Sequence, residues 1–352
     1  RPAVSKAISF PPARPHSASL LNTAINPMTI REASGQDTAA IVSLLKLSLG
    51  EALMPKSESY WKWKHWDNPF GKSPVLLAFE KNELIGVRAF MRWDWTRNGK
   101  TVKAIRAVDT VTHPRHQGKG VFKKLTLSLL NEHKNSDTSF VFNTPNRSSK
   151  PGYIKMGWEE AGNLPVSFNV RRPFNMAARL LGWDGPPTTS TDDDSVPALL
   201  DRSDEVCALL EEHKLQAPEN IKTAITPDYL KWRYACVPVA KYLAITEGGK
   251  SLNAFVIARV KVSKAGRELR ITELIEGKNC DREHLKNLIY MKAESLKVDL
   301  ITMSGLSKFP GCWITLNRGP IVTVFDLNGY ERFHELKSFR NWTPSLGDLE
   351  LF

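Results

Sequence analysis

Residues 107–125 read AVDTVTHPRHQGKGVFKKL. This stretch begins as an apolar, β-branched run, breaks at Pro114, passes two glycines at positions 118 and 120, and then enters a helical pattern. It therefore predicts a strand, a glycine-rich turn and the start of a helix. Such a turn directs backbone N–H groups and the positive end of a helix dipole at one point, which suits a phosphate group.

The bulk composition is that of a globular protein. The 352 residues, 41% of them hydrophobic and 24% charged, are too many for one ordinary core and predict two domains. No run of eighteen apolar residues occurs, so we expect no membrane span and a cytoplasmic protein. The net charge of +12 comes without a dense basic run, which favours anionic small molecules over a nucleic-acid partner.

Four cysteines stand at positions 207, 236, 280 and 312, and no Cys-x-x-Cys pair is present. We expect buried, reduced thiols and no metal site. The first 27 residues are basic and contain no acidic residue. We expect residues 1–27 to be a disordered N-terminal extension without a catalytic role, either a leader-like segment or non-native sequence ahead of Met28.

The first half of the chain predicts an α+β module. Ser34 and Asp37 form a capping-box pattern before a helix with one buried face, and Asn98-Gly99 predicts a hairpin. The strands after that helix are expected at 75–80, 84–96, 101–112, 139–143 and 166–170, with helices after the glycine turn and around 146–158. The order β-α-α-β-β-β-α-β-α-β predicts one mixed, mainly antiparallel sheet.

Residues 182–197 predict a linker, because they are rich in Gly, Pro, Thr and Asp. The linker would separate a module at 28–181 from a second module at 198–352. Part of the first module recurs in the second at one constant offset: Tyr60, Lys62, Trp63, Lys64 and Pro69 correspond to Tyr229, Lys231, Trp232, Arg233 and Pro238. This match predicts an internal duplication. The second copy has no paired glycines after its strand at 270–275, so we expect no similar phosphate site there.

The segment Gln117-Gly118-Lys119-Gly120-Val121-Phe122 resembles the pyrophosphate loop of GNAT acyltransferases, Gln/Arg-x-x-Gly-x-Gly/Ala. Phe122 departs from that pattern, since the family usually has Gly or Ala there. One strand later, Asn146-x-x-Ser149-x-x-x-Tyr153-x-x-x-Gly157-Trp158 is similar to the family's Asn-x-x-Ala-x-x-x-Tyr-x-x-x-Gly-Phe. The chain thus resembles a tandem, two-module bacterial GNAT acyl-CoA N-acyltransferase whose second module is degenerate.

The resemblance implies two α+β modules, each a mixed, mainly antiparallel sheet flanked by helices, and acetyl-CoA as the acyl donor. Tyr153 would protonate the departing thiolate as the general acid. Backbone amides near Val111 and Thr112 would hold the pantetheine arm and polarise the thioester carbonyl. The residues expected to bind the cofactor are Val111, Thr112, Gln117, Gly118, Lys119, Gly120, Val121, Phe122 and Asn146.

Two further sets of residues are candidates on weaker grounds. Asp109 is the candidate general base, with a structural hydrogen bond or a water chain as alternatives. Trp61, His65 and Trp66 are candidates for the acceptor site, with packing of a helix on the sheet as the alternative. For His113 and His116, beside the glycine turn, packing of the loop is the default.

Together these features predict an acetyl-CoA-dependent N-acetyltransferase that acts on a primary amine by direct attack on the thioester. The acceptor would be a small-molecule amine or amino sugar. Two alternatives stay open: an aminoacyl-tRNA-dependent transferase acting on a cell-wall precursor, and a non-catalytic protein that binds an acyl-CoA. The intact glycine loop argues against the first.

Overall fold

The computed structural model describes residues 28–51, 54–181, 193, 195–249, 251–263, 266–307 and 309–351. The predicted extension at 1–27 and most of the predicted linker lie outside these residues. Residues 195–197, the end of that linker, are instead the first turn of helix α6 (Ser195–Asp201).

The first half of the chain follows the predicted element order. Its elements are β1 (Thr29–Glu32), α1 (Thr38–Leu49), α2 (Glu58–His65), β2 (Val75–Glu80), β3 (Glu83–Arg97), β4 (Lys100–Thr112), α3 (Val121–Glu132), β5 (Phe140–Asn143), α4 (Lys150–Lys155), β6 (Glu159–Asn163), β7 (Val166–Val170) and α5 (Pro173–Leu180). Short 3₁₀ helices precede α1 (Gly35–Asp37) and α3 (Pro114–His116).

Local signals account for several of these elements. Asp37 accepts from the backbone N–H of Ser34 at 2.7 Å, which completes the predicted capping box. Asn98 and Gly99 both have positive φ, of 48° and 72°, as the tight turn of a two-residue hairpin requires.

The second half begins with α6 and ends with a short helix near the chain end. Its other elements are α7 (Ser203–Lys214), β8 (Lys222–Thr223), α8 (Pro227–Leu230), a π-helical turn (Lys231–Ala235), β9 (Leu243–Glu247), β10 (Ala254–Ser263), β11 (Gly266–Glu276), α9 (Arg282–Ser295), β12 (Leu300–Ser304), β13 (Ile314–Leu316), β14 (Ile321–Asp326), a 3₁₀ helix (Phe333–Lys337) and α10 (Leu346–Leu349).

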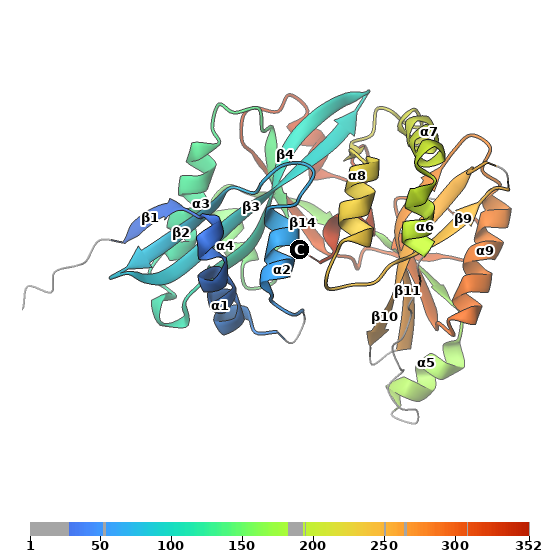
Figure 1. The fold of residues 1–352 in the computed structure, drawn as a ribbon, viewed down its shortest axis with the longest axis horizontal. Helices are drawn as coiled ribbons and strands as arrows, with labels where there is room; N and C mark the ends of the chain where they lie inside the picture. Colours follow the sequence, from blue (N-terminus) through green and yellow to red (C-terminus); the bar gives the residue numbers. More distant parts are fainter. Residues whose placement is uncertain are drawn as a thin grey trace, which may run out of the picture.

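The strands form two mixed sheets that lie side by side (Figure 1). The first has the order β1-β2-β3-β4-β5-β14-β6, with β8 also paired to β3, and the second has the order β13-β7-β12-β11-β10-β9. Among the named strands, only β4 with β5 and β11 with β12 pair in parallel. The two mixed sheets flanked by helices confirm the predicted α+β fold class.

Each sheet contains strands from both halves of the chain, since the first includes β8 and β14 and the second includes β7. β7 lies between β12 and β13 of the second sheet, and β14 lies between β5 and β6 of the first. The chain after β7 also stays with the second sheet, because the N–H groups of Arg171 and Arg172 both donate to the carbonyl of Asp299. The predicted boundary at 182–197 therefore does not separate the two sheets in space.

The repeated segments meet at the centre of the molecule. The indole Nε1 of Trp63 donates to the carbonyl of Trp232 at 2.7 Å, and the Nε1 of Trp232 donates to the carbonyl of Trp63 at the same distance. The two rings are stacked with centroids 4.9 Å apart. Residues that match in sequence thus make reciprocal contacts across the junction of the halves.

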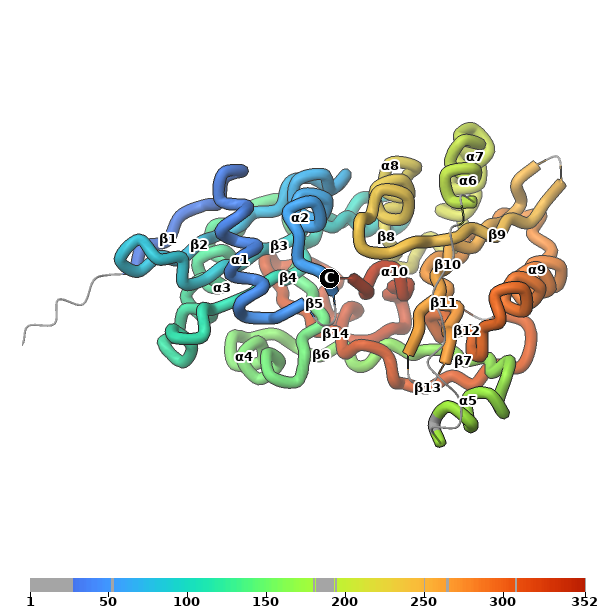
Figure 2. Tube along the Cα trace, turned by 60° about the horizontal axis from the view of Figure 1, so that its bottom comes forward, coloured from blue at the N-terminus to red at the C-terminus, as the bar shows by residue number. Residues whose placement is uncertain are grey.

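The chain end also lies between the two halves (Figures 1 and 2). Arg106 of β4 donates to the carbonyls of Asp348 and Leu349, and Arg233 of the second half donates to the carbonyl of Gly347. A single hydrophobic cluster accordingly includes residues of both halves. A separate cluster lies between the first sheet and helices α3 and α4.

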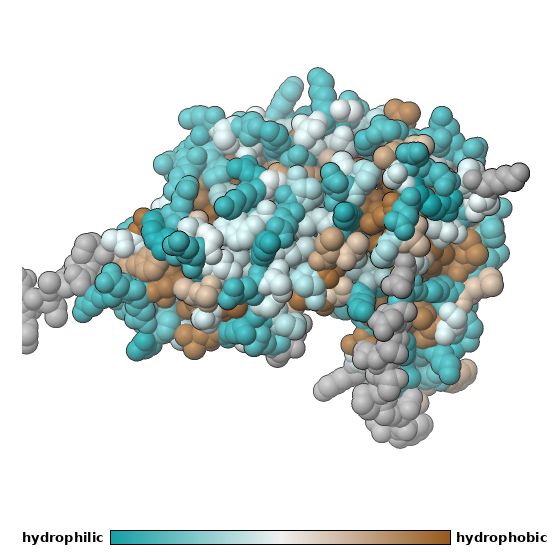
Figure 3. Space-filling view, in the orientation of Figure 1, coloured by the Kyte–Doolittle hydropathy of each residue, from teal (hydrophilic) through white to brown (hydrophobic). Residues whose placement is uncertain are grey.

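Two sequence-based expectations concern the surface. No helix in the described ranges is both long and apolar enough to cross a membrane, and the face drawn in Figure 3 is largely hydrophilic with separate apolar patches. The cysteines are free thiols, but the prediction that they are buried is wrong. Cys207, Cys236 and Cys312 are exposed and Cys280 is half-buried, because Cys207 lies on the outward face of α7 and the other three lie in turns or loops.

Candidate active site

The glycine turn connects β4 to α3 as predicted. Gly118 and Gly120 have φ of 76° and 78°, in the left-handed region that favours glycine. A Cβ atom added at either position would meet no atom within 4 Å. The glycines are therefore required by the backbone conformation, and the space in front of them is open.

The N-terminus of α3 is suited to an anion. Gly120 is its N-cap residue and provides no side chain to bond the first N–H groups. In the second half, the equivalent helix α9 begins differently, because Asp281 Oδ1 accepts from the N–H groups of Glu283 and His284 at 3.1 and 3.0 Å. A carboxylate thus occupies in α9 the place that a phosphate would take at α3.

His113 and His116 hold the turn against the β2–β3 hairpin. His116 is buried, with Nδ1 3.4 Å from Glu80, and His113 Nε2 lies 3.7 Å from Glu83. Ligand atoms of Glu83, His113 and His116 lie within 4.8 Å of one another. However, the Glu83 carboxylate already pairs with Arg115 at 2.8 Å, so these contacts support loop packing.

β4 and β5 separate just before the turn. They pair only from Ala104–Phe140 to Arg106–Phe142. Beyond that point Val111 and Thr112 pair with β3, at Val87 and Gly86. Within the described part of the chain, the edge of β4 that faces β5 is therefore unpaired at 108–112. An extended ligand could pair with the backbone there, as the resemblance implied.

Tyr153 lies on α4 and is linked to Thr110 of β4 through Arg88, which donates to both hydroxyls. Asn146 Oδ1 accepts from the N–H groups of Ser148 and Ser149 at 3.1 and 2.8 Å and so fixes the start of the turn that leads into α4. These bonds use only the carbonyl oxygen of the Asn146 amide and leave its Nδ2 group to donate. The hydroxyl of Tyr153 accepts from Nη1 of Arg88 at 2.7 Å, and both side chains are buried.

The packing of Phe122 accounts for its departure from the family pattern. Its ring packs edge-on against that of Tyr153, with centroids 5.4 Å apart. Space for the ring exists because residue 152 is glycine: a Cβ there would lie 2.9 Å from Cε1 of Phe122. The first turn of α3 and the tyrosine of α4 are thus in direct contact.

Asp109 occupies a bulge in β4. Arg88 pairs with Thr110 and Ala89 with Val108, so Asp109 is left without a partner residue on β3. Its φ of 39° is left-handed, a conformation that aspartate tolerates better than most residues.

The Asp109 carboxylate is the centre of a buried polar network. Its Oδ2 lies 2.7 Å from Nζ of Lys64 and 2.8 Å from Nε2 of His65, whose Nδ1 lies 2.9 Å from the hydroxyl of Ser73. Burial alone would raise the pKa of Asp109, but Lys64 and His65 together hold it well below its ordinary value. Burial lowers the pKa of His65, which keeps the imidazole neutral. An anion stabilised in this way is a weak base, which argues against the role predicted for Asp109.

The predicted acceptor residues are mostly internal. Trp61 and His65 are buried and contact each other with ring centroids 4.0 Å apart. Trp66 is half-buried, with Nζ of Lys72 4.2 Å from its ring. The first two side chains therefore pack α2 on the sheet, and only Trp66 presents a surface to a ligand.

The sequence interpretation missed Arg88, Lys64 and Ser73 as members of the site. Lys64 and Ser73 carry no distinctive local signal. Arg88 does carry one, because it interrupts the apolar run Leu84 to Met91 on a strand of the predicted sheet. A cation at such a position needs an explanation.

Comparison with known proteins agrees with this geometry. Residues 29–161 match the sequence profile of the acetyltransferase (GNAT) domain. These residues form a GNAT acetyltransferase domain. The match ends in β6, just before the chain crosses to the second sheet, and it confirms the resemblance inferred from the two motifs.

Solved structures share the fold over most of the chain. A probable N-acyltransferase of unknown function from Enterococcus faecalis has a TM-score of 0.59 at 11% identity, over 86% of this chain and 73% of its own. A GCN5-related N-acetyltransferase from Anabaena variabilis gives 0.59 at 14% identity over the same shares. One from Kribbella flavida gives 0.56 at 10% identity, over 87% and 73%. No curated protein matches the chain by sequence.

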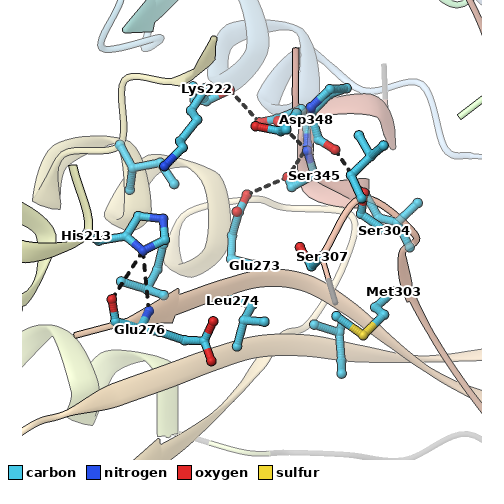
Figure 4. A pocket seen from close by; sticks show the side chains of 18 of the residues that line it. His213, Lys222, Glu273, Leu274, Glu276, Met303, Ser304, Ser307, Ser345 and Asp348 are labelled. Carbon is cyan, nitrogen blue, oxygen red and sulfur yellow. Dashed lines mark hydrogen bonds between the residues drawn. The ribbon is translucent and has the colours of Figure 1, made fainter. Parts of the chain in front are cut away.

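A cavity of about 360 Å³ lies outside the GNAT domain, between β11, the end of β12 and the chain end (Figure 4). The carboxyl groups of Glu273 and Asp348 line it. Glu273 accepts from Tyr234 at 2.5 Å and from Ser345 at 2.9 Å. Burial, and then the charge of Asp348, raise the pKa of Glu273 to about 8. A diphosphate bound there would face both carboxyl groups, whereas α3 offers it an open helix N-terminus.

Proposed function

We propose that the GNAT domain transfers an acetyl group from acetyl-CoA to a primary amine by direct attack on the thioester. The observation that carries this proposal is the contact between Phe122 and Tyr153, which joins the first turn of α3 to the tyrosine of α4. A group bound at the turn would therefore extend toward a hydroxyl that can donate a proton.

The residues of the glycine turn, β4 and the start of α4 are suited to bind acetyl-CoA. The diphosphate would bind the open N–H groups of residues 117–122, with Gly118 and Gly120 allowing close approach and the α3 dipole stabilising its charge. Lys119 and the side chain of Gln117 would add hydrogen bonds. The pantetheine arm would pair with β4 at Val111 and Thr112, and Nδ2 of Asn146 would bind it from the other side.

The chemical roles follow from these positions. Tyr153 would protonate the thiolate as it leaves, because Arg88 links its hydroxyl to Thr110 on the part of β4 that does not pair with β5. Asp109 is held as a stabilised anion by Lys64 and His65. A water chain would therefore deprotonate the amine. The acceptor, a small-molecule amine or amino sugar, would approach from the face of the sheet that α1 and α2 cover, where Trp66 is the accessible aromatic residue.

Calorimetry with acetyl-CoA tests the donor site. We expect wild type to bind, and Gly120→Glu to weaken binding at least tenfold, because a carboxylate would stand where the diphosphate binds. Gly99→Glu is the matched control, since Gly99 also has a left-handed φ of 72° and open surroundings but lies at the far end of β4. Equal affinity in all three proteins would overturn the proposed site.

A release assay for free CoA across amine classes tests the reaction. We expect release with at least one class of amine, and none from Gly120→Glu at the same donor concentration. Tight binding of acetyl-CoA with no release in any class would contradict the transferase and favour an acyl-CoA-binding protein.

A further inference from the structure

Arg88 is a buried cation for which the described residues provide no anionic partner. It lies in the middle of β3 with its side chain fully buried, and no carboxylate among the described residues lies within salt-bridge distance. Nη1 donates to the hydroxyls of Thr110 and Tyr153. Its Nε and Nη2 groups are buried and make no hydrogen bond to any residue that the structure describes.

Aromatic rings provide the rest of its surroundings. The guanidinium lies 4.6 Å from the ring centroid of Phe90, 5.3 Å from that of Tyr153 and 5.7 Å from that of Phe122. These contacts stabilise a cation only in part. A buried charge without a counter-charge is costly, and such a group is seldom retained for stability alone.

Two other fully buried arginines are arranged differently. Arg106 and Arg233 are both supplied with backbone carbonyls from the chain end. Within the described ranges Arg88 donates to two hydroxyl groups, those of Thr110 and Tyr153. Arg88 is thus placed to pair with a negative charge that would develop on the Tyr153 oxygen during a reaction.

The second sheet offers an internal comparison. It has a bulge at the same place, with Ile257 opposite Glu273 where the first sheet has Arg88 opposite Thr110. That half also lacks the open helix N-terminus, since Asp281 caps α9. The arginine therefore occurs in the half that has the glycine turn, and an apolar residue replaces it in the half that does not.

We propose that Arg88 is a positioning residue for Tyr153 and supplies the positive charge that the phenolate requires once its proton has left. This inference rests on the proposed acetyl transfer. A guanidinium can only donate hydrogen bonds. Because Nη1 donates to the Tyr153 oxygen, the hydroxyl proton is directed away from Arg88, toward an acceptor in the opening between β4 and β5.

The reaction balances with this assignment. The amine nitrogen bonds to the thioester carbonyl carbon, and the C–S bond breaks with its electron pair on sulfur. The Tyr153 hydroxyl gives its proton to that sulfur, which yields the CoA thiol, and the phenolate is then paired with Arg88. The proton lost by the acylated nitrogen returns to the phenolate through solvent, so that thioester and amine become amide and thiol.

A double-mutant cycle tests whether Arg88 acts through Tyr153. The four proteins are wild type, Arg88→Met, Tyr153→Phe and the double variant, assayed with acetyl-CoA and the most active amine of the release assay. We expect Arg88→Met to lower kcat about tenfold or more, with the acetyl-CoA Kd within twofold of wild type. In the Tyr153→Phe background the same change should cause no further loss, because the phenolate is then absent.

Two further measurements separate positioning from simple packing. The Tm of Arg88→Met should equal or exceed that of wild type, because methionine fills the space without a buried charge. Arg88→Lys should retain more turnover than Arg88→Met, since it keeps the charge, and it replaces Arg88→Met in the cycle if that variant does not fold.

Additive losses in the cycle, or full activity of Arg88→Met beside an active wild type, would overturn the assignment while leaving the transferase intact. A wild type that binds acetyl-CoA but releases no CoA with any amine would overturn the proposed function, and this inference with it.

Discussion

At position 109 the sequence and the structure assign different chemistry to one carboxylate. The sequence places an acidic residue on the strand before the glycine turn, which predicts a base. The structure places Lys64 and His65 against it and puts its backbone in a bulge. Lys64 comes from a helix 45 residues earlier, so no local pattern could have revealed the pair. For Tyr153 the sequence signal is local, because the motif residues Asn146, Ser149 and Gly157 all lie within seven positions of it.

Replacing Asp109 with asparagine should destabilise the protein by about 3 kcal/mol at pH 7, because it removes the carboxylate that pairs with the buried Lys64 ammonium. Asparagine tolerates the left-handed backbone as well as aspartate does, so the change reports on charge. The folded-state pKa of Asp109 lies below its ordinary 3.8. Its contribution is therefore present above pH 3.8 and is lost as the pH falls below that value. Urea unfolding of both proteins at pH 7 and pH 3 measures the difference.

The double variant Lys64→Met with Asp109→Asn is the control for this prediction. It removes both charges and should recover much of the lost stability. A double variant less stable than Asp109→Asn alone would show that the charge pair is not the cause.

At the scale of elements, short-range patterns predicted most of the first half. The hairpin at Asn98-Gly99, strand β2 and the buried face of α3 each follow from a few adjacent residues. The glycine turn was predictable for the same reason. The packing of α3 on α4 was not, because it depends on Phe122 and Gly152, which are 30 residues apart and fit each other only in the folded chain.

Gly152→Ala should therefore displace the Phe122 ring and, through it, the first turn of α3. The added methyl group would meet the Phe122 ring at 2.9 Å, and we expect a loss of about 1–3 kcal/mol in stability together with lower CoA release. Combining it with Phe122→Leu should restore stability, because the smaller side chain makes room. Thermal unfolding and the release assay on the single and double variants measure both effects. A double variant no better than Gly152→Ala would contradict this packing.

At the scale of the whole molecule, the sequence predicted two modules but not how they are joined. The strand at 166–170 was predicted correctly as a strand, yet periodicity cannot reveal which sheet a strand enters. The second sheet, in the order β13-β7-β12-β11-β10-β9, repeats the order β6-β14-β5-β4-β3-β2 of the first. With the reciprocal bonds of Trp63 and Trp232, we interpret this as two related modules that have exchanged their last strands.

The exchange predicts how fragments should behave. A chain cut at a protease site inserted after Gly182 should remain one particle in size-exclusion chromatography, because β7 and β14 each pair across the cut. Residues 28–181 expressed alone should aggregate, since β5 and β6 then lack the strand between them. The uncut chain with the same insertion is the control. Separation of the cut pieces without denaturant would contradict the exchange.

The same arrangement has a consequence for the order of synthesis. The gap between β5 and β6 is filled by β14, which leaves the ribosome roughly 160 residues after β6. At a synthesis rate of about 5–20 residues per second, the edges of β5 and β6 that face β14 stay unpaired for roughly 10 to 30 seconds. The donor site and Tyr153 are encoded early, but the sheet that supports them closes only after β14 has been synthesised. Chaperones that cover strand edges on nascent chains should therefore bind this protein during that interval.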